Sequence, residues 1–251
     1  MAQVFKPSAN SVAAAALLGI AIGVPAVWLS LAGLSRSPAN TKVNVGINQP
    51  VPFSHSHHAW ELGIDCRYCH TSVEKSPFAG LPSTETCMSC HSQIWTNSPL
   101  LEPVRQSYET GKPIQWNLVN SVPQFVYFNH SIHIARGINC NTCHGAVTDM
   151  NITWRGNSFQ MAWCLQCHRA PERYIYDLKD PNKEAPREQV FDLYWKLQKE
   201  GVKNMTPKEV ELIKGQFDGS DDPADKAKGK EMVKKLDIRV QQLADCNVCH
   251  R

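Results

Sequence analysis

One short motif recurs five times in the chain and uses every cysteine that it contains. In each copy, two residues separate a pair of cysteines, and a histidine directly follows the second cysteine. The copies are Cys66–His70, Cys87–His91, Cys140–His144, Cys164–His168 and Cys246–His250. Five copies that account for all ten cysteines cannot arise by chance in 251 residues. This motif therefore constrains the fold more than any other feature.

The spacing of the motif fits the covalent attachment of haem c. Two thiols three residues apart on a tight turn each bond one vinyl group of the same porphyrin, and the histidine that follows binds the iron. Zinc ribbons and redox-active thiol pairs use the same cysteine spacing, but neither requires a histidine after every pair. We therefore predict five haem c groups. The attachment residues are Cys66, Cys69, Cys87, Cys90, Cys140, Cys143, Cys164, Cys167, Cys246 and Cys249, and the proximal ligands are His70, His91, His144, His168 and His250.

An apolar segment near the N-terminus predicts one transmembrane helix. Residues 7–35 carry no charged side chain, and residues 11–34 are long enough to cross a hydrocarbon core of about 30 Å as a helix. A cleaved signal peptide is the alternative, but this stretch is longer than the apolar part of such peptides. We expect an uncleaved signal anchor in the cytoplasmic membrane, with residues 1–10 in the cytoplasm. Because bacteria attach haem c outside this membrane, the haem domain is expected on the periplasmic or extracellular side.

The haem-binding part of the sequence contains an internal repeat. Residues 53–58 read FSHSHH and residues 128–133 read FNHSIH, and both are followed by a Gly-Ile-Asp/Asn step and two CxxCH motifs. Duplication of one unit explains this pattern. The predicted organisation is a linker 35–50, a first di-haem module 51–96, a Pro-rich connector 97–125 of extended chain and turns, a second di-haem module 126–172, a helical segment 173–245 and a fifth haem site 246–251.

Few residues remain to build an apolar core of the usual kind around five porphyrins. We therefore expect a mainly α fold with much irregular structure, a multihaem cytochrome c wrapped around its haems, in addition to the transmembrane helix. In the helical segment, Pro186 and Gly201 bracket an amphipathic helix, and Thr206 with Glu209 has the pattern of a capping box. Residues 224–245 are predicted to form a further helix.

The five histidines outside the CxxCH motifs are candidates for distal iron ligands. The repeat selects His55, His58, His130 and His133, because a helix places both histidines of HxxH on one face but aims them at two neighbouring haems. By analogy with small multihaem cytochromes, we assign His55 and His130 to the haem of the CxxCH motif that follows each of them. The haems bound by His58 and His133 stay open.

One haem receives no distal histidine from the repeat. The candidates for its distal ligand are Met150, Met161 and His57, besides an open position. His57 aligns with Ile132 in the second copy, so it is not part of the repeated pattern. A methionine beside a CxxCH motif also packs against porphyrin as an apolar filler, and the sequence does not separate Met150 from Met161. A thioether ligand favours ferrous iron, so we expect this haem to have the highest potential.

Several strings in the sequence are similar to those of a known family. They are Pro123–His133 (PQFVYFNHSIH), Cys143–Gly145 with Met150, and residues 161–172 (MAWCLQCHRAPE). Over roughly residues 50–175, the chain resembles the pentahaem cytochrome subunit of bacterial alternative complex III. The resemblance implies a redox subunit of a membrane quinol:acceptor oxidoreductase. Such a subunit relays electrons from an iron–sulfur subunit to a monohaem cytochrome c subunit or another extracytoplasmic acceptor. The quinol would bind in polytopic membrane subunits, and this chain would contain no catalytic residues of its own.

Other functional classes fit the sequence less well. A membrane-anchored multihaem quinol dehydrogenase of the nitrate- and nitrite-respiration type is the alternative, since it shares the anchor but lacks the FxHxxH repeat. Multihaem nitrite reductases use a CxxCK motif, which does not occur here, and the tetrahaem subunit of photosynthetic reaction centres has fewer haems and mostly methionine ligands. A net charge of +3 without a dense Lys/Arg cluster argues against nucleic acid as a partner.

Overall fold

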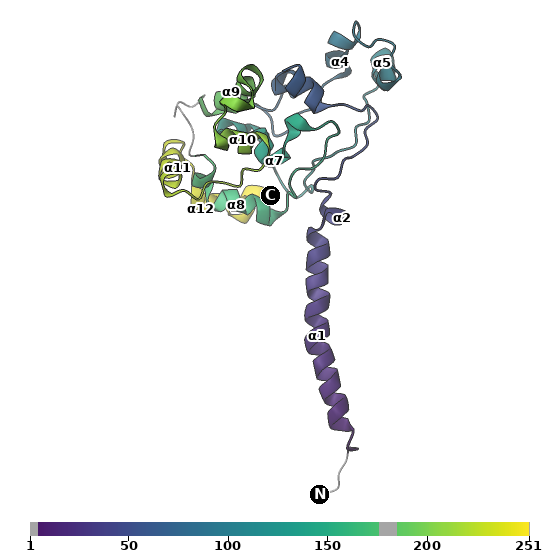
Figure 1. The fold of residues 1–251 in the computed structure, drawn as a ribbon, viewed down its shortest axis with the longest axis vertical. Helices are drawn as coiled ribbons and strands as arrows, with labels where there is room; N and C mark the ends of the chain where they lie inside the picture. The colour runs from purple at the N-terminus through teal and green to yellow at the C-terminus, as the bar shows by residue number, and fades with distance from the viewer. Residues whose placement is uncertain (1–4, 176–184, 251) are drawn as a thin grey trace. The chain divides into compact units, whose positions relative to one another are not determined.

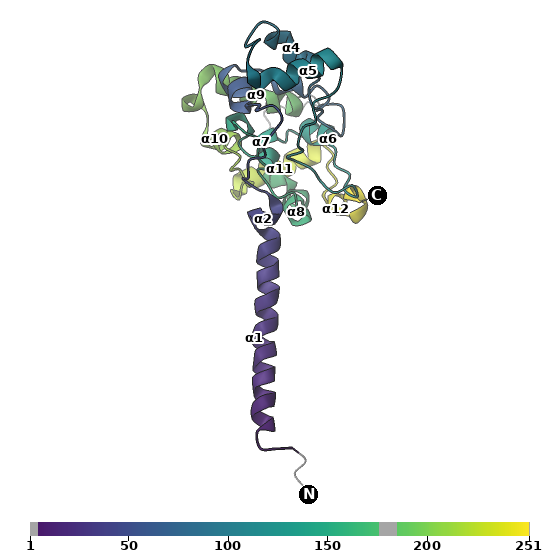
Figure 2. The same ribbon diagram turned by 90° about the vertical axis from the view of Figure 1, so that its right-hand side faces the viewer.

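The computed structural model describes residues 5–175 and 185–250 of the chain. The chain divides into two compact units, Met1–Val43 and Asn44–Arg251. Figures 1 and 2 show that the first unit is dominated by one long helix and the second by many short ones.

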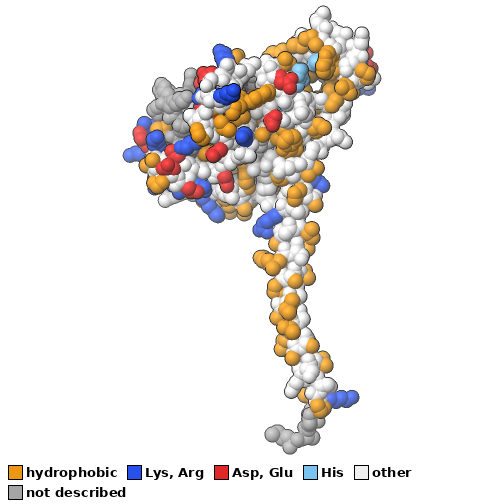
Figure 3. Space-filling model, in the orientation of Figure 1, with side chains coloured by type: hydrophobic (Ala, Val, Ile, Leu, Met, Phe, Trp, Pro, Cys, Tyr) orange, Lys and Arg blue, Asp and Glu red, His pale blue; other side chains and the backbone are white. Residues whose placement is uncertain are grey.

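The first unit contains the apolar helix α1 (Ala9–Arg36), which encloses the segment 11–34 predicted to cross a membrane. Its 28 residues give a length of about 42 Å at 1.5 Å per residue. Apolar side chains lie all along its visible face (Figure 3), and no residue of the helix is buried. Among the described residues it is the one helix whose length and composition suit a membrane span, and a signal sequence has the same properties. A single turn, α2 (Pro38–Thr41), follows.

The second unit consists of short helices joined by irregular chain, and its described residues form no strand. An antiparallel bridge joins Gly46 to Trp154. This mainly helical, irregular architecture confirms the predicted fold class. The helices are α3 (Cys66–Cys69), α4 (Thr84–His91), α5 (Glu102–Thr110), α6 (His130–Ala135), α7 (Cys140–His144), α8 (Met161–Arg169), α9 (Ala185–Glu200), α10 (Pro207–Ile213), α11 (Pro223–Lys235), α12 (Val240–Leu243) and α13 (Cys246–Cys249).

The CxxCH motifs themselves form short helices, and in two of them the preceding residue explains where the helix begins. Asp65 and Asn139 precede α3 and α7, and each side chain accepts a hydrogen bond from the backbone N–H two residues later. Such caps satisfy a backbone donor that the first helical turn leaves without a partner. The local sequence thus starts a helical turn at the first cysteine, which brings both cysteines and the histidine to one side.

Two predictions of secondary structure are corrected. The connector 97–125 contains the helix α5, whereas the sequence predicts only extended chain and turns there. Pro103 occupies the first turn of α5, where proline is tolerated because its missing N–H has no helical partner in any case. The helix predicted over 224–245 is interrupted after α11, where Asp237 adopts a positive φ of 50°. A shorter helix, α12, follows that interruption.

The apolar core is divided into three small clusters that depend on the helical segment 173–245. Helix α9 agrees with the predicted amphipathic helix, and α10 begins with the predicted capping box of Thr206 and Glu209. Helix α9 contributes to two clusters and α11 to the third. The clusters are Val73, Ile134, Val190 and Phe191; Leu193, Leu197 and Ile213; and Ile175, Met232 and Leu236.

A glycine in α11 permits the closest packing of this helix against the rest of the unit. A Cβ added to Gly229 would lie 1.9 Å from the carbonyl oxygen of Glu172. Alanine normally stabilises a helix by about 1 kcal/mol relative to glycine. Here the clash with backbone dominates, so we expect Gly229→Ala to destabilise the protein by about 1–3 kcal/mol and to lower its melting temperature. The exposed Lys230→Ala is the matched control and should change stability by less than about 0.5 kcal/mol. A higher melting temperature for Gly229→Ala would contradict the packing described.

Candidate haem-binding sites

We number the candidate sites by their CxxCH motifs in chain order. Site 1 is Cys66–His70, site 2 Cys87–His91, site 3 Cys140–His144, site 4 Cys164–His168 and site 5 Cys246–His250. All ten cysteines lie among the described residues. None of them forms a disulfide, and each is half-buried or exposed. Their thiols are therefore not consumed by disulfides and are available for thioether bonds.

The two FxHxxH segments have the same ring geometry. Phe53 meets the ring of His55 edge-on, with centroids 5.0 Å apart, and stacks on His58 at 4.5 Å. In the second copy, the ring of Phe128 is edge-on to His130 at 4.7 Å and stacked on His133 at 4.6 Å. The phenylalanine thus orients both histidines, and the sequence repeat corresponds to a repeat in three dimensions.

Three of the predicted distal histidines face the histidine of a CxxCH motif. An imidazole nitrogen binds a metal at about 2.0–2.1 Å with its ring centre about 1 Å further back, so rings on opposite sides of one iron have centres about 6 Å apart. All three pairs match this separation, so their residues fit an iron between them. The pairs are His58–His91 at 6.2 Å, His130–His144 at 6.3 Å and His133–His168 at 6.1 Å.

His55 is the histidine that the repeat assigns to site 1. It is the counterpart of His130, and His70 is close enough to lower its pKa electrostatically. Burial is the larger cause, and together these effects lower the pKa of His55 to about 4. The pKa of His144 is also lowered to about 4, mainly by burial and further by His130. Both rings are therefore neutral near pH 7, and a neutral imidazole is the form that binds a metal.

Hydrogen bonds to Nδ1 orient most of these imidazoles. A histidine whose Nδ1–H is held by an oxygen presents Nε2 to the metal, and this contact fixes the ring. Backbone carbonyls take this role for most of the rings, and for His55 the partner is the Thr153 hydroxyl. The carbonyl partners and Nδ1···O distances are Gly80 for His70 (2.7 Å), Ile94 for His91 (3.1 Å), Leu243 for His168 (2.9 Å), Phe125 for His250 (3.0 Å), Ser54 for His58 (2.9 Å), Pro77 for His130 (2.7 Å) and Asn129 for His133 (2.7 Å).

The three candidates for the fifth distal ligand lie in very different surroundings. Met150 is fully buried, with its Cε atom 3.6 Å from the position of a Cβ on Gly145. Met161 is 66% exposed at the start of α8, one turn before Cys164. The Nδ1 atom of His57 lies 2.8 Å from a carboxylate oxygen of Glu61, so this ring is held by a side chain at the surface.

Site 5 is held against the segment that precedes α6. The backbone N–H of Tyr127 donates to the carbonyl of Cys249 at 2.8 Å, and the ring of Phe125 lies 5.8 Å from that of His250. The described residues bring no histidine ring to His250 of the kind seen at the other sites. The structure thus places the fifth CxxCH motif beside the second FxHxxH segment, which sequence reasoning treated as separate.

Sequence reasoning did not identify the glycines that surround the proximal histidine of site 3. A Cβ on Gly156 would lie 2.4 Å from the carbonyl oxygen of His144, and one on Gly215 would lie 2.5 Å from Gly145. Gly145 and Gly215 also have positive φ angles of 75° and 63°, which favour glycine. Backbone from two distant segments therefore packs directly against the loop after His144. Single glycines in irregular chain gave no sequence signal for this contact.

Comparisons with known proteins relate the chain to cytochromes c. The family described as "Cytochrome c7 and related cytochrome c" matches residues 126–188, and the "Class III cytochrome C family" matches residues 32–100. The chain is also similar to the "Menaquinone reductase, multiheme cytochrome c subunit" of Nitratidesulfovibrio vulgaris. That similarity is 32% identity over 141 residues, 48% of this chain and 67% of the relative. The chain belongs to the multihaem cytochromes c. Covalently bound haem c is therefore its cofactor, and electron transfer is its general function.

The angles between facing histidine rings predict distinct spectra for the oxidised cytochrome. Parallel axial rings separate the iron dπ orbitals in energy and give a rhombic low-spin EPR signal, whereas perpendicular rings leave them nearly equal and give a strongly axial signal. The ring planes differ by 6° for His130–His144 and by 62° for His58–His91. We expect His130→Met to remove a rhombic signal and His58→Met a strongly axial one. The opposite outcome would contradict these ring orientations.

Proposed function

We propose that this cytochrome is the pentahaem electron-transfer subunit of a membrane quinol:acceptor oxidoreductase of the alternative complex III type. In this proposal all five CxxCH motifs carry haem c, and residues 1–10, the anchor 11–34 and the modules have the boundaries predicted above. Bound haem c supplies a one-electron Fe(III)/Fe(II) couple at each site.

The proposal gives sites 1–4 two histidine ligands each. The facing rings support His58 for site 2, His130 for site 3 and His133 for site 4. His55 completes site 1, by its equivalence to His130 and its proximity to His70. Each HxxH pair thus serves both haems of its own module.

The proposal assigns Met161 as the distal ligand of site 5. Met161 lies three residues before Cys164 on α8, so both side chains share one face of the helix. Helix α8 in turn contacts α12, which directly precedes site 5. Met150 is packed inside the protein against Gly145, and His57 binds Glu61, which gives both residues other roles.

One observation carries the conclusion that these sites transfer electrons without binding a substrate. Histidine rings face each other in pairs 6.1–6.3 Å apart, so two histidines would hold the iron of each of these sites from opposite sides. An iron that binds or activates a substrate needs an open position. Sites 2–4 are therefore suited to accepting and donating electrons only.

The partners follow from the same assignment. The relative carries the name of a menaquinone reductase subunit, which supports a quinone-linked complex for this chain as well. We propose an iron–sulfur subunit as electron donor, polytopic subunits as the site of quinol oxidation, and a monohaem cytochrome c subunit or an external protein as acceptor. Helix α1 anchors the cytochrome in the cytoplasmic membrane, with its haem domain on the periplasmic or extracellular side.

The name of the relative also supports a second candidate. In a menaquinone reductase the electrons would pass through the cytochrome towards the quinone. The same haem-binding residues would then transfer electrons in the direction opposite to that of a quinol-oxidising complex. The anchored quinol dehydrogenase of nitrate and nitrite respiration remains the alternative in which this chain would interact with quinol itself.

Purification of the native assembly from membranes tests the proposal. We expect iron–sulfur and polytopic subunits to co-purify with the cytochrome, and the assembly to pass electrons from quinol to an oxidised soluble cytochrome c. The isolated cytochrome is expected to be reduced rapidly by dithionite but to show no sustained quinol oxidation. Net quinone reduction by the assembly would favour the menaquinone reductase direction. Sustained quinol turnover by the isolated cytochrome would support the quinol dehydrogenase alternative.

A further inference from the structure

We propose that the five sites are ordered 2–1–3–4–5 in space, with the two modules joined through sites 1 and 3. This inference rests on the proposed haem occupancy of all five motifs but not on the identity of the complex. The order differs from the order along the chain, because it reverses the first module. Four sets of contacts carry it, one for each step.

The steps within each module follow from the HxxH pairs. His130 and His133 lie one turn apart on α6 and face the histidines of sites 3 and 4, so these two sites are neighbours. The equivalent pair His55 and His58 makes sites 1 and 2 neighbours. A hydrogen bond of 2.8 Å between the hydroxyls of Tyr68 and Ser89 also joins these two motifs directly.

The two modules contact each other reciprocally. The backbone N–H of Ser131 donates to the carbonyl of Ser76 at 3.3 Å, and that of Ser56 donates to the carbonyl of Met150 at 3.1 Å. Ser56 and Ser131 are equivalent in the repeat, and Ser76 and Met150 each lie six residues after the histidine of site 1 or site 3. Each FxHxxH segment is therefore docked on the loop of the other module. Reciprocal contacts of this kind define a pseudo-twofold axis between two copies of one unit.

Equivalent residues meet where such an axis passes, and here the meeting residues belong to sites 1 and 3. Cys66 and Cys140 are the first cysteines of these sites, and both pack against one apolar cluster that contains Ile134 and Phe191. His130 of site 3 also binds the carbonyl of Pro77 in the loop that follows site 1. The porphyrins attached to Cys66 and Cys140 would therefore approach each other at this junction.

Helix α9 covers this junction and contacts both modules. The hydroxyl of Tyr194 lies 2.9 Å from the side-chain oxygen of Asn139 and 2.8 Å from that of Asn141, on either side of Cys140. On the side of site 1, the guanidinium of Arg67 stacks over Phe191 at 4.1 Å.

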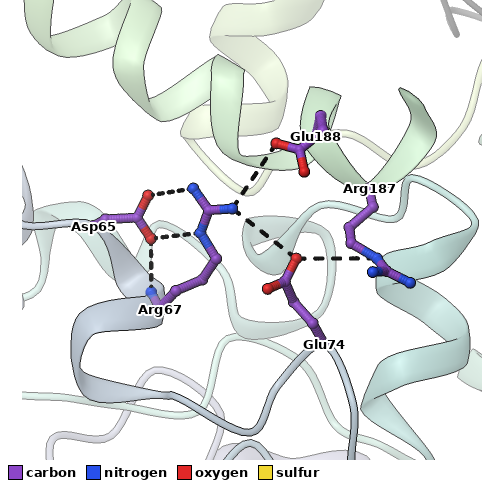
Figure 4. A network of polar contacts seen from close by, with 5 residues as sticks. All are labelled: Asp65, Arg67, Glu74, Arg187 and Glu188. Carbon is purple, nitrogen blue, oxygen red and sulfur yellow. Dashed lines mark hydrogen bonds and ion pairs between the residues drawn. The ribbon is translucent and has the colours of Figure 1, made fainter. Parts of the chain in front are cut away.

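A network of charged side chains next to Cys66 also connects α9 to the segment around site 1 (Figure 4). Arg67 binds Asp65 at 2.8 Å and lies 3.9 Å from Glu188 of α9, while Arg187 of α9 lies 3.9 Å from Glu74. Helix α9 thus links the segments that carry site 1 and site 3.

Site 5 continues the row beyond site 4. The Nδ1 atom of His168 is bonded to the carbonyl of Leu243, which lies three residues before Cys246. Helix α8, which carries Cys164 and His168, also contacts α12, which ends at Leu243. Sites 2 and 5 are therefore the two ends of the row.

Redox potentiometry of the haem-loaded protein tests the order. His133→Met is expected to raise the midpoint potential of site 4, so that site 4 is reduced before site 3. The added negative charge at site 4 then disfavours the reduction of its neighbour, site 3. We expect the midpoint potential of site 3 to fall in this variant. His58→Met raises the potential of site 2, which is not a neighbour of site 3, and should leave that midpoint unchanged. The site 3 signal is identified by its loss in His130→Met, and His57→Met is the control for a substitution that replaces no ligand.

Two results would overturn the order. One is a site 3 midpoint that falls as far in His58→Met as in His133→Met, and the other is a midpoint that moves in neither. If His133→Met loses its haem, iron anomalous scattering from crystals of the haem-loaded wild-type chain replaces it. The shortest iron–iron distance between modules is then expected to join sites 1 and 3, and any other pair would refute the proposal. Neither measurement uses quinol or partner subunits, so its failure would leave the proposed complex untouched.

Discussion

The mass of the mature cytochrome is expected to exceed that of its polypeptide by five haem groups. Removal of the haem at site 5 is expected to leave the protein folded, whereas removal of the haem at site 3 is expected to unfold it. Cys246→Ser with Cys249→Ser removes the attachment of a haem at the end of the chain. Few contacts connect α13 to the rest of the second unit, chiefly the hydrogen bonds from Tyr127 and to Phe125. We therefore expect a folded protein with four haems.

The matched change at site 3, Cys140→Ser with Cys143→Ser, affects the centre of the molecule. Asn141 in the same motif is fully buried and bonded to the carbonyl of Ile213, and Cys140 packs in the cluster that contains Phe191. Loss of this haem should remove more than about 5 kcal/mol, which is comparable with the whole net stability of a domain. Intact mass and visible absorbance of the purified variants measure both outcomes. A folded, four-haem site 3 variant would contradict the central position of this site.

Met161→His is expected to lower the highest midpoint potential of the protein by on the order of 0.1 V, because imidazole stabilises ferrous iron less than a thioether does. Met161→Leu should instead leave one iron five-coordinate, with a high-spin EPR signal in the oxidised protein. The control is Met150→Leu, a change of similar volume in a fully buried position. It should cost less than about 1.5 kcal/mol and alter no ligand signature.

Potentiometry and EPR on these three variants decide the identity of the fifth distal ligand. If Met161→Leu leaves every signal unchanged while His57→Leu alters one, the assignment of Met161 is wrong. A high-spin signal in Met150→Leu alone would move the ligand to Met150.

The sequence by itself determined the chemistry of this protein. Covalent haem attachment depends on residues within five consecutive positions, so the CxxCH motifs identify it without a fold. The helices α9 and α10 were predictable for the same reason, because their boundaries depend on proline, glycine and a capping box within a few residues. The helix α5 was missed, since the prolines of the connector hid a segment in which Pro103 occupies a compatible first turn.

Only the tertiary structure decided which residues from distant segments lie together. The pairs His58–His91 and His133–His168, left open by the sequence, depend on how each module folds back on itself. The placement of Cys66 and Cys140 against one apolar cluster depends on the reciprocal docking of two copies of one repeat, which no local pattern encodes. Ligand types follow from short-range covalent geometry, whereas the spatial order of the sites follows from long-range packing.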